Sequence, residues 1–345
     1  MTSKHPPRKI ANYPIPGDPK GGALLIFGDE NAKNMALMSA GFPDGPEIFL
    51  PFASRLAKET DTLVGVTCLP GYDDREDKPW TEHKRDKKDG YSFDEMAICI
   101  REAAKALRSE SSCPSKPKFT GIFHDWGTCP GAMWSNRAIA EGSDNAPDEL
   151  VYFDVLMPPH PQTLNIPAEE KKSMYQVFCG SFYQCVFFCA FGIQRYVSNA
   201  LAIMCLVLGI IPIAVLPIGP TLKIDDAIHQ QRSPPLSLSR VIFMCYPYFH
   251  MTSVSVKKLL KYELDDDFTL PQDLAKVPVL YMYGTEKRAA FHVNASVKIL
   301  EREHKENKSK SNAIAVDGAG HYLYIQKPDL CFDCVTSFMQ KDKVK

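Results

Sequence analysis

The chain has 345 residues, of which 45% are hydrophobic and 23% are charged, and its formal net charge is −1 at pH 7. This length accommodates one large core with an inserted subdomain, and the balanced charge excludes a protein that binds nucleic acid through a strong positive field. The first nine residues are polar and basic, unlike a secretory signal peptide. The eleven cysteines show no regular spacing that would indicate disulfide pairs. We therefore expect an intracellular, cytoplasmic protein with reduced thiols.

The first half of the chain alternates strand-like and helix-like segments. Strands are predicted at 23–27, 35–39, 62–69, 119–123 and 150–156, and helices at 48–58 and 93–107. Near the C-terminus the alternation returns, with strands at 277–283 and 313–316 and a closing helix at 328–339. This order predicts a doubly wound α/β fold, with a mostly parallel sheet and helices on both faces.

The alternation breaks in the middle of the chain. Between residues 173 and 222 the only charged residue is Arg195. This composition differs from that of the segments before and after it. We expect a core built from residues 1–158 and 266–345, interrupted by a strongly apolar, helical insert at 159–265.

The predicted strand at 119–123 runs directly into His124-Asp125-Trp126-Gly127, and a helix is predicted to follow. Pro130 suits the first turn of that helix, where its missing N–H is not needed. Strand, tight turn and helix form the layout of the nucleophile elbow of G-x-S-x-G enzymes, with Asp125 in place of Ser. A carboxylate at such an elbow can attack carbon directly. The alternative is that Asp125 caps the helix.

An ester on Asp125 has to be hydrolysed by a base-activated water, and the developing oxyanion needs hydrogen-bond donors. His321 follows a predicted strand and a glycine-rich turn late in the chain, which is where this architecture places its histidine. The predicted oxyanion donors are the backbone N–H groups of Trp126 and of Phe42, in the early loop 41–44. The alternatives are an inert loop histidine and a plain turn at 41–44.

Three motifs together resemble the α/β-hydrolase superfamily, and within it the branch of epoxide hydrolases and haloalkane dehalogenases. They are Gly41-Phe42-Pro43-Asp44, Phe123-His124-Asp125-Trp126-Gly127 and Gly320-His321, and they span nearly the whole chain. The resemblance implies the α/β-hydrolase fold, a covalent alkyl-enzyme ester on the aspartate, and a helical cap at the position of the 159–265 insert. It implies neither a metal nor an organic cofactor.

The early loop and the elbow each depart from the family pattern. The loop commonly begins His-Gly, whereas this chain has Ala40-Gly41 and keeps only the backbone donor. The residue two positions before the nucleophile is often small, whereas here it is Phe123.

The acid that orients the histidine departs from the pattern too. It usually follows the strand at 277–283, where this chain has Arg288 at about the expected position. Glu286 is one substitute. Asp154 is the preferred one, because some haloalkane dehalogenases place their acid after the earlier strand in a similar acid-x-x-x-Pro setting. The remaining alternative is that Asp154 is structural.

The family supplies two cap tyrosines that protonate the leaving oxygen of an epoxide, a task suited to a neutral hydroxyl. The candidates here are Tyr183, Tyr246 and Tyr248, with Tyr175 as a weaker one; the alternative is that they merely pack. A dehalogenase needs halide donors instead. The side chain of Phe42 cannot donate, and the insert contains no Trp. An epoxide substrate is therefore favoured.

The insert contains a charge-free run of 19 residues, 200–218, close to the length that spans a bilayer. A single crossing would separate the two halves of the core. We expect helices that pack on the core and line a tunnel for a large apolar substrate. Docking on a membrane surface is the rival expectation, and the two are compatible.

The sequence thus predicts an epoxide hydrolase for apolar or lipid-like epoxides. Asp125 attacks carbon, a cap tyrosine protonates the leaving oxygen, and His321, oriented by Asp154 or Glu286, activates water. One rival is a haloalkane dehalogenase. The other is a non-catalytic lipid-binding or membrane-docking protein on a hydrolase frame. The sequence does not indicate an oligomeric state.

Overall fold

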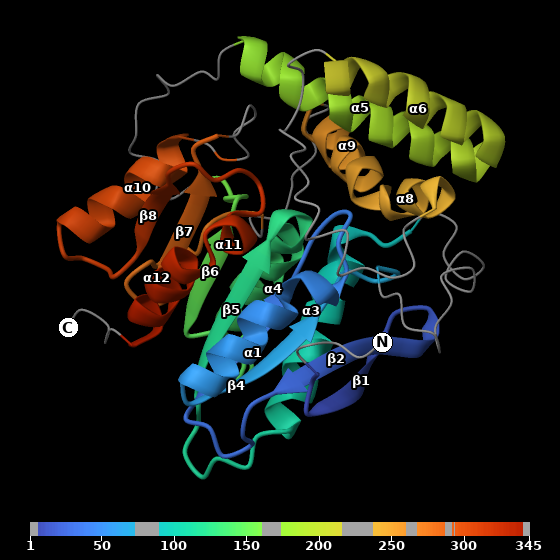
Figure 1. Ribbon diagram of the computed structural model, residues 1–345. Coiled ribbons are helices and arrows are strands. Elements are labelled where there is room, and N and C mark those ends of the chain that lie inside the picture. The colour runs from blue at the N-terminus through green and yellow to red at the C-terminus, as the bar shows by residue number, and fades with distance from the viewer. Residues whose placement is uncertain are drawn as a thin grey trace.

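The computed structural model describes residues 6–72, 90–160, 174–215, 237–259, 268–286, 292 and 294–340. Within these ranges the chain forms one eight-stranded sheet (Figure 1). In spatial order its strands are β1 (Lys9–Ile15), β2 (Asp18–Phe27), β4 (Thr62–Thr67), β3 (Asn34–Ser39), β5 (Lys118–His124), β6 (Glu149–Phe153), β7 (Val279–Gly284) and β8 (Asn312–Val316). The pairs β1–β2 and β2–β4 are antiparallel, and all the others are parallel. The predicted, mostly parallel sheet is confirmed.

Helices cover both faces of this sheet. One hydrophobic core includes α3 (Phe93–Ser109), α4 (Thr128–Ala140) and α10 (Asn294–Lys305), and the other includes α1 (Leu50–Glu59), α11 (Leu323–Gln326) and α12 (Pro328–Gln340). Successive residues of a strand point to opposite faces. In β3, Met35 and Leu37 pack in the first core, whereas Ala36 and Met38 pack in the second. Burial on both faces explains why the central strands are apolar throughout.

The sequence pattern does not predict β1, and it places the start of β2 too late. In β1 only Tyr13 and Ile15 are buried, so the strand carries little apolar signal. The pattern also extends β6 by three residues too many. The strand ends at Phe153 because Asp154 turns the chain with a φ of 72°.

A separate group of four helices lies on one side of the sheet (Figure 1). We call α5 (Met174–Tyr196), α6 (Asn199–Val215), α8 (Leu238–Met244) and α9 (Tyr246–Leu259) the helical layer. The rings of Tyr248 in α9 and Trp126 after β5 are 4.9 Å apart, which places the layer over the carboxyl end of β5. The predicted ends of the insert, at 159 and 265, adjoin or fall in stretches outside the described residues.

No helix in the described part of the chain combines the length and the hydropathy that are needed to cross a membrane. The expected contact of the insert with a membrane surface stays a prediction at this point.

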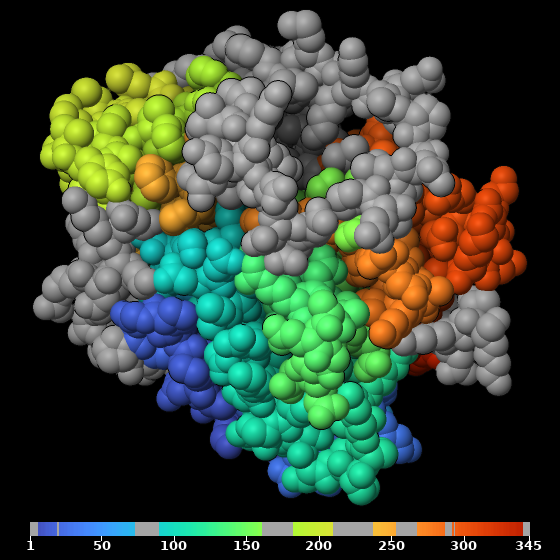
Figure 2. All heavy atoms as spheres, turned by 180° about the vertical axis from the view of Figure 1, so that it is seen from behind, coloured from blue at the N-terminus to red at the C-terminus, as the bar shows by residue number. Residues whose placement is uncertain are grey.

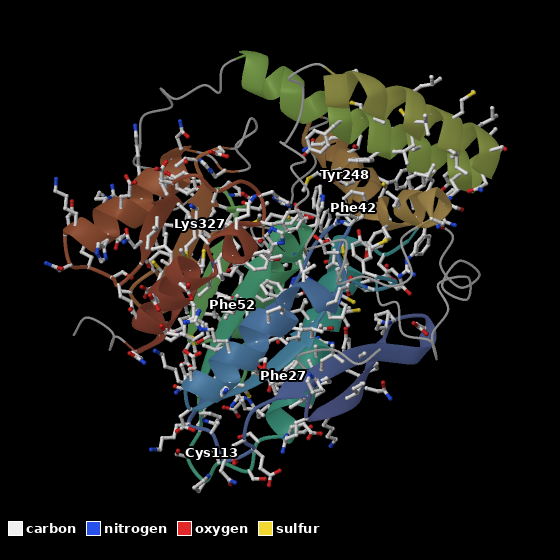
Figure 3. The ribbon with its side chains drawn as sticks, viewed as in Figure 1. Phe27, Phe42, Phe52, Cys113, Tyr248 and Lys327 are labelled. Atoms are coloured by element: carbon white, nitrogen blue, oxygen red, sulfur yellow. The ribbon has the colours of Figure 1, made fainter. Side chains whose placement is uncertain are left out.

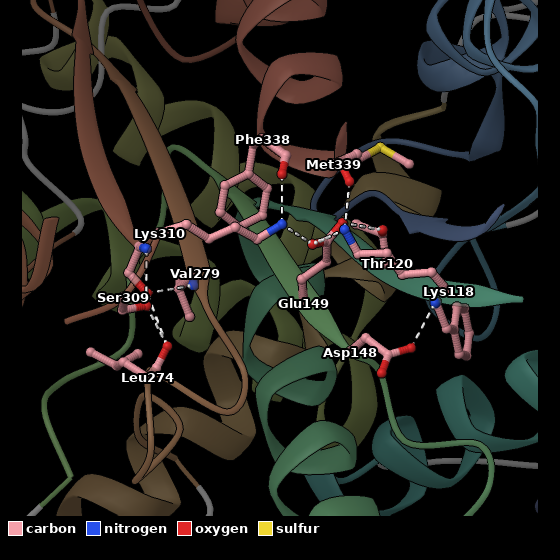
Figure 4. A network of polar contacts seen from close by, with 12 residues as sticks. Lys118, Thr120, Asp148, Glu149, Leu274, Val279, Ser309, Lys310, Phe338 and Met339 are labelled. Carbon is pink, nitrogen blue, oxygen red and sulfur yellow. Dashed lines mark hydrogen bonds and ion pairs between the residues drawn. The ribbon is translucent and has the colours of Figure 1, made fainter. Parts of the chain in front are cut away.

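A buried ion-pair network joins strands and a helix at the opposite, amino-terminal edge of the central strands (Figure 4). Glu149, fully buried at the start of β6, accepts hydrogen bonds from Thr120 and from Lys310, and it lies 2.8 Å from the ammonium of Lys118. Lys310 also donates to the carbonyl of Phe338 in α12 over 2.6 Å. Burial lowers the pKa of Lys310 to about 8, although the carboxylate of Glu149 opposes this change.

We predict that Lys310→Met lowers the free energy of unfolding by about 3 kcal/mol, because it leaves the buried carboxylate of Glu149 with less compensation. Urea unfolding followed by circular dichroism measures this loss.

The double variant Lys310→Met/Glu149→Leu removes both charges and should recover most of the lost stability. If the double variant is less stable than Lys310→Met alone, the network stabilises the fold by its favourable charge interaction, and the prediction is wrong.

Candidate active site

Asp125 lies where the sequence predicts the elbow. β5 ends at His124, residues 125–127 form a short 3₁₀ turn, and α4 begins at Thr128. Asp125 has a φ of 52°, a conformation that non-glycine residues rarely adopt and that is found at functional sites. The carboxylate accepts the backbone N–H of Phe42 at Oδ1 over 2.9 Å and is also hydrogen-bonded by the N–H of Trp126. α4 has no side-chain cap at its N-terminus, so the capping alternative does not describe Asp125.

Two glycines make the close packing around the elbow feasible. A Cβ on Gly41 would lie 2.2 Å from the backbone nitrogen of Trp126 and 2.5 Å from Oδ1 of Asp125. Only glycine lets the early loop approach the carboxylate so closely. A Cβ on Gly131 would lie 2.7 Å from the ring of Phe123. The bulky Phe123 therefore fits before the elbow because α4 offers a glycine opposite it.

The structure brings His321 and Asp154 to Asp125 from the loops after β8 and β6. Nε2 of His321 lies 3.5 Å from Oδ2 of Asp125, and Nδ1 contacts Oδ2 of Asp154 at hydrogen-bond distance. Asp154 is fully buried. Its N–H donates to the carbonyl of Met282 over 2.8 Å, and its carbonyl accepts the hydroxyl of Tyr281 over 3.0 Å. The carboxylate is thus fixed on the side of the imidazole that faces away from Asp125.

Glu286, the other candidate for the orienting acid, follows β7 and is exposed. Its backbone N–H donates to the carbonyl of Ala319 over 2.9 Å. The position of Arg288 lies outside the described residues. The geometry favours Asp154 over Glu286, because the buried carboxylate of Asp154 contacts the imidazole directly.

Burial dominates the electrostatics of the candidate nucleophile. It raises the pKa of Asp125, while the neighbouring His321 and the N–H groups of Trp126 and Phe42 act in the opposite direction. The ionised carboxylate is thus poorly solvated and is held by directed donors rather than by bulk water. Such a group is more reactive toward carbon than an exposed aspartate.

Aromatic side chains from both parts of the molecule surround this carboxylate. Phe42 and Tyr248 face each other at the boundary of the core and the helical layer (Figure 3), with ring centroids 5.3 Å apart. The indole N–H of Trp126 is hydrogen-bonded to the hydroxyl of Tyr248. The ring centroid of Tyr183, from α5, lies 6.1 Å from that of Tyr248. Burial raises the pKa of both tyrosines, and the charge of Asp125 adds to this effect. Both hydroxyl groups therefore stay neutral close to the carboxylate.

The structure does not bring Tyr246 to the site. Its hydroxyl donates to the carbonyl of Pro70 over 3.0 Å. The centroid of its ring lies 5.7 Å from that of Tyr72 and 5.8 Å from that of Tyr91. Positions 246 and 248 are two residues apart in α9, so they point about 200° apart around the helix axis. Tyr246 is therefore a packing residue, and the side chain of Tyr175 lies outside the described part of the chain.

The sequence reasoning misses His124 as a support of the site. Its ring is fully buried and lies 4.5 Å from the ring of His321. Because a carbonyl only accepts, Nε2 of His124 donates to the carbonyl of His321 over 3.2 Å, and Nδ1 shares a hydrogen bond with the hydroxyl of Tyr324 over 3.3 Å. His124 thus holds the loop that carries His321. Its place in the elbow motif is the only sequence signal.

A second support joins the two loops that carry Phe42 and His321. The hydroxyl of Tyr322 donates to Oδ2 of Asp44 over 2.9 Å, and both residues are buried. The partners are 278 residues apart in the chain. The sequence shows each as part of a motif but gives no signal that they meet.

Comparison with solved structures identifies the fold of the chain. No family model and no curated protein matches the sequence. Among solved structures, an epoxide hydrolase from metagenomes of hot environments is similar, with 14% identity over 97% of this chain and 99% of that chain and a TM-score of 0.59.

Two further structures carry other activities. A loop variant of a haloalkane dehalogenase from Bradyrhizobium elkanii has 15% identity over 96% of each chain and a TM-score of 0.55. A thermophilic esterase from Thermogutta terrifontis has 13% identity over 96% of this chain and 98% of that chain, with a TM-score of 0.54. Because one architecture serves several reactions, the likeness alone does not define the chemistry. The chain has the α/β-hydrolase fold.

Proposed function

We propose that the protein is a hydrolase that opens apolar epoxides through a covalent ester on Asp125. The observation that carries this proposal is the position of Asp125 between two sets of partners. The N–H of Phe42 holds Oδ1, while Oδ2 faces Nε2 of His321. One carboxylate oxygen is thus free to attack carbon, and the other already lies where an oxyanion would form.

In the first step Oδ2 of Asp125 attacks an epoxide carbon, and the bond from that carbon to the epoxide oxygen breaks. The oxygen takes a proton from the hydroxyl of Tyr248 or Tyr183, whose phenols stay neutral at pH 7. The products of this step are an alkyl ester on Asp125 and a neighbouring hydroxyl group on the substrate.

In the second step Nε2 of His321 takes a proton from water, and the resulting hydroxide attacks the ester carbonyl carbon. Asp154 stabilises the imidazolium at Nδ1. The N–H groups of Phe42 and Trp126 stabilise the oxyanion on Oδ1. Collapse breaks the acyl–oxygen bond, His321 returns the proton to the leaving alkoxide, and a diol is released. The proton that the hydroxide brought to the carboxyl group of Asp125 passes to the tyrosinate left by the first step, so both groups return to their starting forms. One oxygen from water remains in the carboxylate of Asp125.

The surroundings of Trp126 favour an epoxide over a haloalkane. A halide leaving group needs N–H donors, and the indole N–H of Trp126 is directed to the hydroxyl of Tyr248. The side chain of Phe42, at the early-loop position, offers no donor. An epoxide uses this arrangement, because Tyr248 accepts from Trp126 and donates its own proton to the leaving oxygen.

The aromatic residues around the carboxylate favour an apolar substrate. The ring centroids of Phe42 and Phe187 lie 5.1 Å apart, and those of Phe187 and Tyr248 lie 4.9 Å apart. Such a surface stabilises hydrocarbon on either side of the reacting carbon. We therefore propose lipid-like epoxides as the substrate class.

We predict that His321→Gln traps the ester. Because the first step does not need the imidazole as a base, incubation with a long-chain alkyl epoxide should add the mass of the substrate to the peptide that contains Asp125. Peptide mass spectrometry detects this adduct. Wild-type protein in heavy-oxygen water should instead incorporate one heavy oxygen into Asp125 in a single turnover.

The double variant Asp125→Asn/His321→Gln is the matched control, since it lacks only the nucleophile. A folded His321→Gln protein that forms no adduct, together with wild-type protein that forms no diol, would sink the proposed function.

We predict that Tyr248→Phe and Tyr183→Phe each lower kcat/KM for epoxide opening, and that the tyrosine that acts as the acid loses about a hundredfold or more. Tyr246→Phe is the control, because its hydroxyl bonds the carbonyl of Pro70 and does not reach the site. Initial rates of diol formation measure the effect. Equal rates for all three variants would remove the tyrosines from the mechanism.

We predict that Asp125→Asn raises the free energy of unfolding at pH 7 by on the order of 1 kcal/mol. Burial raises the pKa of Asp125 in the folded protein. The ionised carboxylate therefore lowers stability at any pH above that raised pKa. The gain should shrink as the pH falls through that raised pKa, and it should vanish below 3.8, the ordinary value, where folded and unfolded states both bind the proton.

Thermal unfolding of wild type and variant across pH tests this prediction. Asp333→Asn, on the exposed side of α12, is the control and should change little. A variant that is less stable than wild type at pH 7 would show that the partners of the carboxylate outweigh its burial.

A further inference from the structure

Asp154 occupies a strained position in the chain. Its φ is 72°, and the N–H of Val155 donates to the carbonyl of Phe153 over 2.9 Å. A bond that spans a single residue with a positive φ defines the rare and strained form of the γ-turn. Such a conformation persists only where the surroundings hold it. The backbone of Asp154 therefore needs partners before its carboxylate can hold His321 in place.

Both backbone groups of Asp154 are held by β7. Its N–H donates to the carbonyl of Met282 over 2.8 Å, which continues the parallel pairing of β6 with β7. Its carbonyl instead accepts a side chain, the hydroxyl of Tyr281, over 3.0 Å. Burial raises the pKa of Tyr281 well above its ordinary value, and the charge of Asp154 adds to this effect. Tyr281 thus keeps its proton and donates it to Asp154.

Tyr281 has a second partner in His292, two residues before α10. Nδ1 of His292 lies 2.8 Å from the hydroxyl oxygen of Tyr281. Because the hydroxyl gives its one proton to the carbonyl of Asp154, Nδ1 supplies the proton of this second bond. The imidazole also packs on the stacked rings of Tyr281 and Tyr283, with centroids 5.5 Å and 4.9 Å away. His292 therefore directs the proton of Tyr281 to Asp154.

α10 holds the same loop at a second point. This helix, in red-orange at the right of Figure 2, contributes to the apolar core in which Tyr281 packs. The buried hydroxyl of Ser296, in its first turn, donates to the carbonyl of Met157 over 2.8 Å. Met157 follows Asp154 by three residues. The loop after β6 is thus tied both to the start of α10 and, through Tyr281, to the residue that precedes it.

We propose that Tyr281, itself held by His292, is a positioning residue for His321. The bonds run from His292 through Tyr281 to the backbone of Asp154, whose carboxylate contacts Nδ1 of His321. In the proposed function, on which this assignment rests, the imidazole acts as a base only when the ester is hydrolysed. Loss of the hydroxyl of Tyr281 should therefore slow the second step and leave the first one unchanged.

Single-turnover kinetics with a long-chain alkyl epoxide test the proposal. Rapid-quench mass spectrometry of the whole protein follows the ester on Asp125 as it forms and decays. Tyr281→Phe should form the ester at the wild-type rate and slow its decay about tenfold or more, because a small displacement of a reacting group is costly. His292→Leu should also slow the decay. His292→Asn, which keeps an N–H donor near the position of Nδ1, should restore it.

The matched control is Tyr283→Phe. Tyr283 lies two positions further along β7, stacks on Tyr281 and belongs to none of the bonds that lead to Asp154. This variant loses the same hydroxyl group from a neighbouring ring, and it should match the wild type in both steps. Circular dichroism should show that all four variants are folded.

Proton NMR without substrate gives a readout that does not depend on the reaction. The Nδ1 proton of a histidine that donates to a buried carboxylate resonates far downfield, and its absence from His321→Gln assigns the signal. Tyr281→Phe should move this signal upfield, because Asp154 is held less firmly. Tyr283→Phe should leave it in place.

The proposal is wrong if Tyr281→Phe slows both steps alike or neither, or if the His321 signal does not move. An equal loss in Tyr283→Phe would overturn it as well, since packing of the two rings would then explain the effect. Wild-type protein that forms no ester would count against the proposed function itself. The NMR signal would still decide whether Tyr281 positions His321.

Discussion

A carboxylate buried at the end of a strand is the constraint on which the rest of the site depends. An ion removed from water is costly unless directed partners replace the solvent. For Asp125 these partners are the N–H groups of Phe42 and Trp126 and the ring of His321. The positive φ of Asp125 and the missing side chain of Gly41 exist in this structure because the donors have to reach the carboxylate at short range. In the proposed reaction, the destabilised carboxylate is also what makes the group useful as a nucleophile.

The partners of Asp125 come from loops that are far apart in the chain, and the fold ties these loops to one another. Tyr322 bonds Asp44, and His124 bonds the carbonyl of His321. The loop that carries Phe42 and the loop that carries His321 are thus held as one unit beneath the helical layer. Neither support touches the proposed reacting atoms. Both are positioning groups that fix where the donors and the imidazole lie relative to the carboxylate.

The sequence was sufficient for those parts of the fold and site that depend on local pattern. Apolar runs located the central strands, and the motif at 123–127 located the elbow, because strand, turn and helix follow one another in the chain. The sequence pattern did not predict contacts between residues that are far apart in the chain. It left Asp154 and Glu286 open, and it grouped Tyr246 with Tyr248 although the helix turns them apart. It also gave no sign that Gly131 makes room for Phe123, or that Lys310 pairs with Glu149.

The two candidate proton donors, Tyr183 and Tyr248, belong to the helical layer, whereas Asp125, His321 and Asp154 belong to the sheet core. In the proposed reaction the two steps, ring opening and ester hydrolysis, therefore use residues from different parts of the chain. Opening of the ring draws on both parts, and release of the diol draws on the core alone. Sequence change confined to residues 174–259 can therefore alter which ring is opened while the water-activating half stays intact. Substrate choice and turnover would then diverge independently among descendants of one ancestral chain.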